Sequence, residues 1–475
     1  TAEKNFSATA SAMNVDVLIT ADLSNAVGKK LVVYEYLYQI VDGKEFLISS
    51  HEDIHDEKQT ITIPKQEIRT TAKDKNTQKS EGIAKKDATI IDTVNYSGLI
   101  VGQEYTVKGV LMLKGTNEPL LVNGKKVTAE KTFVPEKSFG SVDVEFTFDA
   151  SALQGEAVVV FEHLYVQDVE VASHTDIEDQ GQTVDYPEHE IKTTAKDKDT
   201  QKSEGIAKKN ATIIDTVSYS GLIMGQEYTV KGTLMLKGTK KPLLVNGKEV
   251  TAEKTFVPEK SSGSVDIAFT FDASALQGEA VVVFEHLYVQ DVEVAAHTDI
   301  EDQGQTVDYP EHEIKTTAKD KDTQKAEGIA KKNVTIIDTV NYSGLIVGQE
   351  YTVKGVLILK GTKEPLLVNG KEVTAEKTFV PEKSSGSVDV EFTFDASALK
   401  GESVVVFEHL YADGVEVASH TDINDKGQTV TYKLGKLKVT MPNQKNSGLI
   451  TALKTGDMLT VTPYKIGRAS CRERV

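Results

Sequence analysis

Three stretches of the chain with nearly identical sequences each place a glutamine eight residues after a histidine. The first is "ASHTDIEDQGQTV" at 172–184, and close copies start at Ala295 and Ala418. A neutral imidazole can act as a general base near pH 7. A glutamine side chain is an amide, which reacts only when a nucleophile attacks its carbonyl carbon. Chemistry at this glutamine would therefore require a nucleophile and an acid that polarises the amide.

Polar residues that fall on the apolar face of a strand are the informative candidates. In "IRTTAKD", alternation places Thr70 on the inner face and Thr71 on the outer one. In "TIIDTV" and "VVVFEHLY", the same alternation points Asp92 and Glu162 inward. An unpaired buried charge is costly, so two inward acids in one unit indicate a function.

Together these residues contain what acyl transfer requires. His174 can take the proton of the Thr70 hydroxyl. A carboxylic acid kept protonated by burial beside a second acid can donate a hydrogen bond to the Gln182 carbonyl oxygen. Attack of Thr70 on Gln182 would expel ammonia and leave an ester between the first and last strands of the unit.

A period of 123 residues relates these elements along the chain. "IRTTAKD" begins at Ile68, and copies begin at Ile191 and Ile314. A unit of this length is a whole domain rather than a turn of a solenoid. The predicted domains are a C-terminal remnant of a truncated repeat at 1–63 and three complete repeats at 64–186, 187–309 and 310–432. Residues 433–465 are expected to be a linker or the start of an anchor region, and 466–475 read as a translated sequencing adapter.

The remnant at 1–63 acts as an internal control on the histidines. His163 becomes Tyr36 there, whereas His174 is retained. The eight-residue spacing from His to Gln is also kept, although the segment from Glu to His is four residues longer. We therefore assign His174 to the site. The remnant has no Thr strand, so its half-site cannot close within this chain; its residues are Glu35, His51 and Gln59.

Each repeat reads as all-β. Short runs rich in Val, Thr, Tyr and Phe follow one another, as in "EYTVKGVLML" and "SVDVEFTF". Asn123-Gly124 is a type I′ hairpin signal, and only "DASAL" at 149–153, capped by Asp149, hints at a helical turn. About seven strands per unit predict tandem immunoglobulin-like β-sandwich domains in a linear array, without the Trp and Cys pair of antibody domains.

Composition excludes several classes of function. The formal net charge is −18, which disfavours nucleic acid and anionic membrane as partners. The sequence contains no run long enough to span a bilayer. The single cysteine, Cys471, lies in the adapter-like segment, so no disulfide is expected to support the domains. No cofactor is expected, and the "TDIED" acids at 175–179 lack the glycine and ligand spacing of a calcium loop.

The motifs "VVFEHLY" and "TTAKD…IIDTVNYSGL…SHTDIEDQGQTV" resemble the VaFE repeats of Gram-positive surface adhesins. These in turn resemble the Thr–Gln ester-bond domains, immunoglobulin-like modules that cross-link themselves autocatalytically. The resemblance covers 64–432 and the remnant. It implies that the first Thr of each pair is the nucleophile, that Gln is the acyl donor, and that the acids and His assist. The implied cross-links are Thr70–Gln182, Thr193–Gln305 and Thr316–Gln428. The implied assisting residues are Asp92, Glu162, His174, Asp215, Glu285, His297, Asp338, Glu408 and His420.

Three other functions are compatible with parts of the pattern. One is a Lys–Asn isopeptide bond, but position 87 is Asp where the later repeats have Asn210 and Asn333. Another is a plain adhesive repeat that binds a host ligand without any cross-link. A Ser/Thr hydrolase is rejected, because a buried nucleophile that faces its own glutamine leaves no room for a substrate. We therefore expect a single autocatalytic turnover and no enzyme.

The expected role is a structural stalk of an extracellular, cell-wall-anchored adhesin. An ester between terminal strands would carry mechanical load past the rest of each domain and resist proteolysis. A tip outside these residues would contact a host surface ligand. "LKTGD" at 453–457 is similar to the end of a sortase signal, which implies attachment to peptidoglycan in the intact protein, although the usual Pro is missing.

Overall fold

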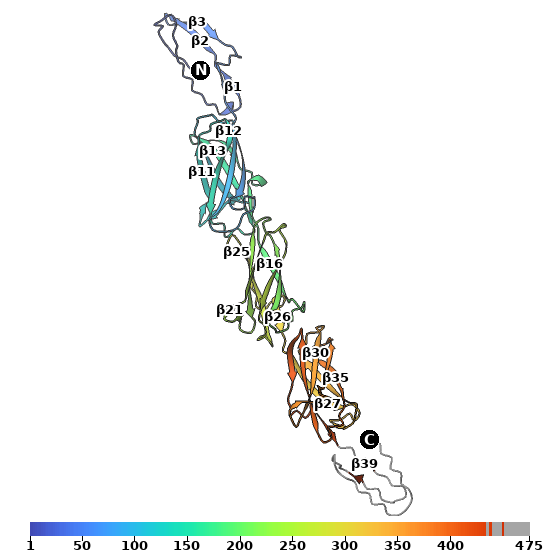
Figure 1. Cartoon of the computed structure of the whole chain (residues 1–475). Coiled ribbons are helices and arrows are strands. Elements are labelled where there is room, and N and C mark those ends of the chain that lie inside the picture. Colours follow the sequence, from blue (N-terminus) through green and yellow to red (C-terminus); the bar gives the residue numbers. More distant parts are fainter. Residues whose placement is uncertain (434–436, 439–448, 451–475) are drawn as a thin grey trace, which may run out of the picture.

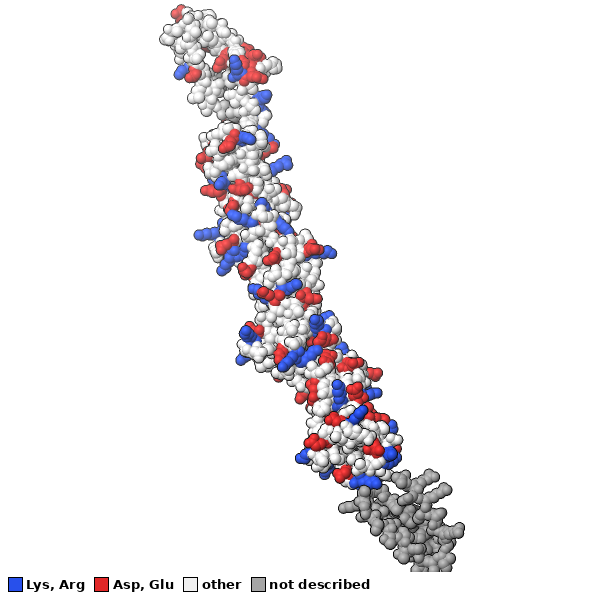
Figure 2. All heavy atoms as spheres, in the orientation of Figure 1, with Lys and Arg blue, Asp and Glu red and all other residues white. Residues whose placement is uncertain are grey.

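The computed structural model describes residues 1–433, 437–438 and 449–450, and shows successive β domains that follow one another along a line (Figure 1). Three of these domains have the same architecture and cover the repeats at 64–432. The expected linker or anchor at 433–465, apart from the few described residues, and the adapter-like segment at 466–475 lie outside this description. In the sphere view, acidic and basic side chains are interspersed along the whole length (Figure 2).

The first repeat contains β5 (Glu67–Asp74), β6 (Ala88–Ser97), β7 (Tyr105–Leu113), β8 (Glu118–Pro119), β9 (Leu121–Val122), β10 (Lys125–Lys126), β11 (Thr128–Phe133), β12 (Phe139–Phe148), β13 (Glu156–Val166), β14 (Val169–His174), η2 (Gln180–Gln182) and β15 (Thr183–Tyr186). The second contains β16 (Glu190–Asp197), β17 (Ala211–Ser220), β18 (Tyr228–Leu236), β19 (Lys241–Pro242), β20 (Leu244–Val245), β21 (Lys248–Glu249), β22 (Thr251–Phe256), β23 (Gly263–Phe271), β24 (Glu279–Val289), β25 (Val292–His297), η3 (Gln303–Gln305) and β26 (Thr306–Tyr309).

The third repeat contains β27 (Glu313–Asp320), β28 (Glu327–Ile329), β29 (Val334–Ser343), β30 (Tyr351–Leu359), β31 (Glu364–Pro365), β32 (Leu367–Val368), β33 (Lys371–Glu372), β34 (Thr374–Phe379), β35 (Gly386–Phe394), β36 (Ser403–Ala412), β37 (Val415–His420) and β38 (Thr429–Lys433). The segment before the repeats contains η1 (Ser24–Ala26), β1 (Lys30–Val32), β2 (Glu35–Val41), β3 (Lys44–His51) and β4 (Thr60–Thr62), and β39 (Leu437–Lys438) pairs β40 (Leu449–Ile450) near the C-terminus.

Each repeat is a sandwich of two sheets. In the first repeat the smaller sheet has the order β12-β6-β5, and the larger one follows β11-β7-β13-β14, with β15 beside β13. The chain leaves β5 and crosses to the larger sheet, where Glu81 bridges Asp185 in parallel. In the third repeat this contact is a full strand, since β28 pairs parallel with β38. A first strand divided between both sheets in this way is characteristic of immunoglobulin-like domains, which agrees with the predicted fold class.

The alternation of side chains explains how the sandwich closes. Along β5, buried and exposed residues alternate, with Thr70 buried and Thr71 exposed. The inner faces of both sheets enclose one hydrophobic cluster per repeat, which in the first includes Val94, Val107 and Leu164, all fully buried. Burial of this apolar surface is the main force that holds the two sheets together.

The structure tests two predicted turns, the hairpin turn at Asn123-Gly124 and the helical turn at 149–153. Asn123 and Gly124 have φ of 52° and 75°, and both positive values are those that a type I′ turn requires. No helix forms at 149–153, but Asp149 Oδ1 accepts from the Ser151 backbone at 3.0 Å, as expected of a cap, and Leu153 N–H donates to the Ala150 carbonyl oxygen at 2.9 Å to close a single turn. Within the repeats, 3-10 turns lie at η2 and η3, directly before the last strand of the first and second repeat, and the equivalent residues 426–428 of the third form a bend.

Candidate cross-linking site

The side chains of Thr70 and Gln182 meet between the two sheets. Thr70 lies on β5 of the smaller sheet, and Gln182 ends η2 beside the larger sheet. Gln182 Nε2 donates to Thr70 Oγ1 at 2.7 Å, although 112 residues separate the two in sequence. Thr70 is 3% exposed and Gln182 is 0% exposed, so the pair is sealed from solvent. The equivalent distances are 2.7 Å for Gln305 to Thr193 and 2.9 Å for Gln428 to Thr316.

His174 lies at the end of β14, directly over Thr70. Its Nδ1 accepts from the Thr70 backbone N–H at 3.0 Å and lies 3.4 Å from Thr70 Oγ1. Nδ1 therefore carries the lone pair, and the ring proton is on Nε2. This tautomer directs the basic nitrogen at the hydroxyl. His297 bonds the Thr193 backbone N–H at 3.1 Å, and His420 bonds that of Thr316 at 3.0 Å.

Asp179 completes the site and was missed by the sequence analysis. His174 Nε2 lies 3.0 Å from Asp179 Oδ2, which fixes the tautomer from the far side of the ring. Asp179 Oδ1 also accepts from the Gly181 backbone at 2.6 Å and so caps the helical turn that ends at Gln182. One carboxylate thus orients both the base and the acyl donor. The sequence did contain a pattern that could have identified this residue, because an Asp follows each site histidine by five residues. The equivalent residues are Asp56, Asp302 and Asp425.

Asp92 and Glu162 form a buried acid pair, one from each sheet. Both are 0% exposed. Burial, together with the neighbouring Asp92 charge, raises the pKa of Glu162 to about 9. Burial also raises the pKa of Asp92 to about 7, and the neighbouring Glu162 and Thr70 side chains partly offset this rise. The pair therefore retains a proton at neutral pH.

The orientation of the Gln182 amide shows where this proton is needed. Gln182 Nε2 also donates to the Val160 carbonyl oxygen at 2.6 Å and to that of His174 at 3.2 Å. Two fixed acceptors thus hold the nitrogen in place and turn Oε1 away from them. Oε1 is buried without a donor, and so are the oxygens of Asp92 and Glu162. A protonated carboxyl of this pair can donate a hydrogen bond to another oxygen, whereas a carboxylate only accepts.

Gly109 makes room for the acid pair. It lies opposite Glu162 in the pairing of β7 with β13. A Cβ added at Gly109 would lie 2.5 Å from Glu162 Oε1 and 2.4 Å from Phe146 Cζ. No larger residue fits without moving the carboxyl. Gly232 and Gly355 stand in the same relation to Glu285 and Glu408.

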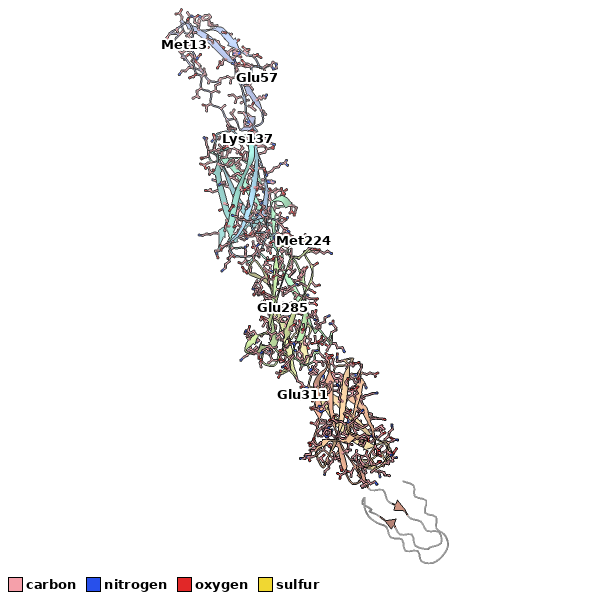
Figure 3. All side chains as sticks on the ribbon, in the orientation of Figure 1. Met13, Glu57, Lys137, Met224, Glu285 and Glu311 are labelled. Carbon is pink, nitrogen blue, oxygen red and sulfur yellow. The ribbon has the colours of Figure 1, made fainter. Side chains whose placement is uncertain are left out.

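The other two repeats assemble the same groups. Burial raises the pKa of Glu285 and of Glu408 to about 9, and the pKa values of Asp215 and Asp338 are raised as well. Glu285 is labelled in the middle of the second repeat (Figure 3).

The segment 1–63 retains part of the strand pairing that forms the site in the complete repeats. Glu35 is paired with His51 on β2 and β3, as Glu162 is with His174. His51 Nε2 contacts Asp56 Oδ2 at 3.0 Å. Glu35 and His51 are exposed, however, and Gln59 is only partly buried. The half-site is therefore open to solvent, as expected for a site without its Thr strand.

Other kinds of site find less support. Asp87, Asn210 and Asn333 are exposed and have positive φ, so these positions serve a turn rather than an isopeptide bond.

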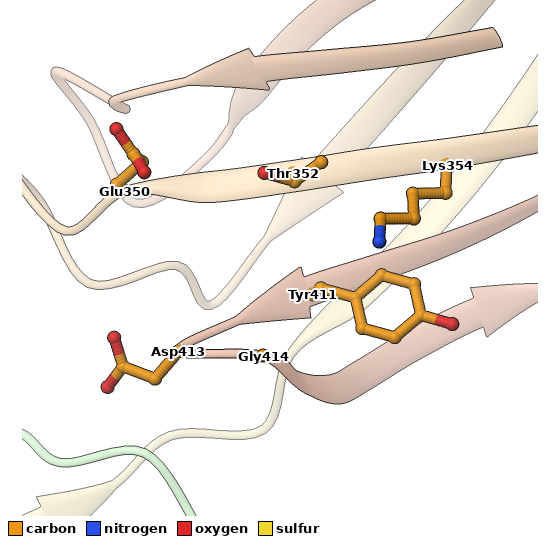
Figure 4. Close-up of a pocket in the computed structure, with 6 residues that line it drawn as sticks. All are labelled: Glu350, Thr352, Lys354, Tyr411, Asp413 and Gly414. Carbon is orange, nitrogen blue, oxygen red and sulfur yellow. The ribbon is translucent and has the colours of Figure 1, made fainter.

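Among the described residues, no cluster of His, Cys, Asp and Glu could hold a metal ion. No helix in that part of the chain is long and apolar enough to cross a membrane. A surface hollow of the third repeat includes Lys354 and Tyr411 but none of the cross-linking residues (Figure 4).

These features define tandem β-sandwich domains, each with a sealed Thr, His, Gln and acid-pair site between its first and last strands. The chain belongs to the family of T-Q ester bond containing domains, whose model matches residues 1–63, 66–186, 189–309 and 312–432. No curated protein matches the sequence.

Similar solved structures include a Mobiluncus mulieris adhesin with disulfide, isopeptide and ester cross-links (16% identity, 54% of this chain and 87% of that one, TM-score 0.23). A 1.5-MDa bacterial ice-binding adhesin covers more (14% identity, 77% and 97%, TM-score 0.32). The Streptococcus agalactiae BspA C-terminal domain is a third (10%, 48% and 97%, TM-score 0.25).

Proposed function

We propose that each complete repeat forms an ester between its Thr and its Gln, and that the stapled repeats are the stalk of a surface adhesin. The observation that carries this proposal is the 2.7 Å contact between Thr70 Oγ1 and Gln182 Nε2, both buried, beside Nδ1 of His174. Membership of the T-Q ester bond family supports the same chemistry.

The step balances within the site. The Thr70 hydroxyl passes its proton to His174 Nδ1 while its oxygen attacks Gln182 Cδ. The protonated carboxyl of the acid pair stabilises the negative charge that develops on Oε1. The proton on His174 Nδ1 then passes to Gln182 Nε2, the bond between Gln182 Cδ and Nε2 breaks, and ammonia leaves. The products are one ester and one ammonia, and no external reagent is consumed.

The position of the bond determines its mechanical role. Pulling force enters a repeat near β5 and leaves near β15, and the ester would join Thr70 on β5 to Gln182, which directly precedes β15. By analogy with a disulfide, closing a loop of 112 residues contributes about 4–5 kcal/mol through the unfolded chain. The strands between Thr70 and Gln182 then carry no load.

We also propose that each repeat reacts once and is not a turnover enzyme; the burial of Thr70 and Gln182 against each other supports this. The proposed location is the cell wall of a Gram-positive bacterium, with sortase attachment to peptidoglycan and a separate tip that contacts a host ligand. The support for this location is the sequence resemblance and the "LKTGD" motif at 453–457, which lies outside the described residues.

Stretching single molecules tests the stalk function. We expect the native chain to reach high force without any step from the three repeats. Thr70→Ala should add one unfolding step, which corresponds to the first repeat. Thr71→Ala is the matched control, because Thr71 is the exposed neighbour on the same strand and should add none. Unfolding steps from all three repeats in the native chain would contradict the proposal.

A further inference from the structure

The linker between successive repeats is short, and it packs against the repeat that follows it. Only residues 187–189 separate β15 from β16. His189 in this linker is buried, and its Nε2 lies 2.9 Å from Tyr228 Oη of the second repeat. Gly221, with φ of 73°, lies so close to the linker that an added Cβ would collide with the Glu188 carbonyl oxygen. The linker therefore has little freedom to bend.

A loop of the preceding repeat also inserts an apolar side chain at each junction. We call residues 80–86, and 203–209 and 326–332 in the later repeats, the docking loop. Ile83 of the first docking loop is 1% exposed and belongs to the hydrophobic cluster of the second repeat. Ile206 is likewise 1% exposed and belongs to the cluster of the third. Ile329 holds the same place in the third docking loop and is 54% exposed.

The receiving surface shows the complementary pattern. We call the sequence Ser-Gly-Leu-Ile at 97–100, 220–223 and 343–346 the corner of each repeat. Ile223 and Ile346, in the corners that face a docking loop, are 0% exposed. Ile100, in the corner of the first repeat, is 52% exposed. The same residue is thus buried or exposed according to whether a complete repeat precedes it.

Polar contacts surround this apolar centre in both junctions. The Lys79 ammonium donates to the carbonyl oxygen of Met224, which lies where the first two repeats meet (Figure 3). Gln154 Nε2 donates to the Val294 carbonyl oxygen at 3.1 Å. Lys85 Nζ donates to Gln290 Oε1 at 2.9 Å. Each of these contacts crosses from the first repeat to the second.

The junction between the second and third repeats has the equivalent three contacts, one of which is an ion pair. The Lys202 ammonium donates to the Val347 carbonyl oxygen, and Gln277 Nε2 donates to that of Val417 at 3.1 Å. Lys208 Nζ lies 3.0 Å from Asp413 Oδ2, so an ion pair replaces the neutral bond of the first junction. In the close-up, a segment of the second repeat passes beside Asp413 (Figure 4).

We propose that the docking loop is a binding element whose partner is the corner of the next repeat, and that this contact fixes the angle between repeats. Stiffness of the array then has two separate sources. The ester acts inside each repeat, and the docking loop acts between them. The proposal does not depend on the ester, because none of the docking contacts involves the Thr–Gln site.

Distance distributions between spin labels test the proposal in the full chain. Labels at Lys254→Cys and Lys377→Cys lie on exposed, equivalent positions of β22 and β34, and Cys471→Ser removes the single other thiol of the chain. We expect a narrow distribution for the otherwise native chain. Ile206→Ser should at least double its width. Ile329→Ser is the matched control and should leave it unchanged, because Ile329 contacts no following repeat among the described residues.

A substitution at an exposed position tests the same contact without removing a buried apolar side chain from the docking loop. Lys202→Met removes the donor to the Val347 carbonyl oxygen from an exposed position and should widen the distribution, whereas Lys325→Met, its equivalent in the third repeat, should not. The proposal is overturned if Ile206→Ser and Lys202→Met both keep the native width, or if the control variants widen it equally.

Discussion

His174 and Asp179 are joined at 3.0 Å through Nε2 and Oδ2, on the side of the imidazole that faces away from Thr70. This contact decides that Nδ1, rather than Nε2–H, is presented to the hydroxyl. The same relationship recurs in each repeat and in the segment 1–63. The aspartate is therefore a positioning residue for the base.

Asp179→Asn should slow cross-linking of the first repeat by roughly 10²–10⁴-fold, because an amide donor at Nε2 favours the wrong tautomer. Peptide mapping would give the fraction of uncross-linked Thr70 as a function of time after synthesis. The second and third sites of the same molecule are internal controls and should react at the native rate. An unchanged rate at the first site would contradict the assigned role.

Gly109→Ala should prevent cross-linking of the first repeat. The added methyl group would displace the Glu162 carboxyl, which lies 2.5 Å from the new Cβ position. Gly115→Ala is the control, since its Cβ would meet only Glu156 Oε2 at 3.7 Å, an ordinary contact. Intact mass should show one ammonia more for Gly109→Ala than for Gly115→Ala. Equal masses would show that the Glu162 carboxyl tolerates the displacement.

The buried acid pair predicts a pH dependence of stability in a chain without cross-links. The pKa of Glu162 is raised to about 9 in the folded protein, against 4.5 for the ordinary side chain. A raised pKa means that stability is full below pH 4.5 and falls as the pH rises towards 9, by at most about 1.4 kcal/mol per pH unit and proton. Urea unfolding of the Thr70→Ala, Thr193→Ala, Thr316→Ala variant across this range should show the fall.

Glutamine at the three glutamates supplies the control for this pH series. Adding Glu162→Gln, Glu285→Gln and Glu408→Gln to the same variant removes the groups with the highest pKa in the site. The slope with pH should then become shallower. A stability that rises from pH 5 to 9 in the parent variant would contradict the protonated pair.

Period-two alternation was sufficient to predict part of the site. Thr70, Asp92 and Glu162 lie on strands with one buried face, and all three are buried as the pattern predicts. The acids stood out because polar residues seldom occupy such positions without a reason. The type I′ turn at Asn123 was predictable for the same kind of reason, since few residues adopt positive φ at low cost.

The features that the sequence did not reveal depend on contacts between distant segments. Asp179 lies in a polar loop, where an acid is ordinarily solvated, and only the fold brings it to His174. Ile83 stands alone in a polar segment without any period, so nothing local indicates that another repeat covers it. The clearance at Gly109 depends on its register with Glu162 across two strands, which alternation does not determine.

The mass of the intact, denatured protein tests the central claim most directly. The account predicts that the purified chain weighs three ammonias less than its sequence, and that Thr70→Ala, Thr193→Ala and Thr316→Ala each restore one of them. A mass equal to that of the unmodified sequence, with all three repeats folded, would contradict the account.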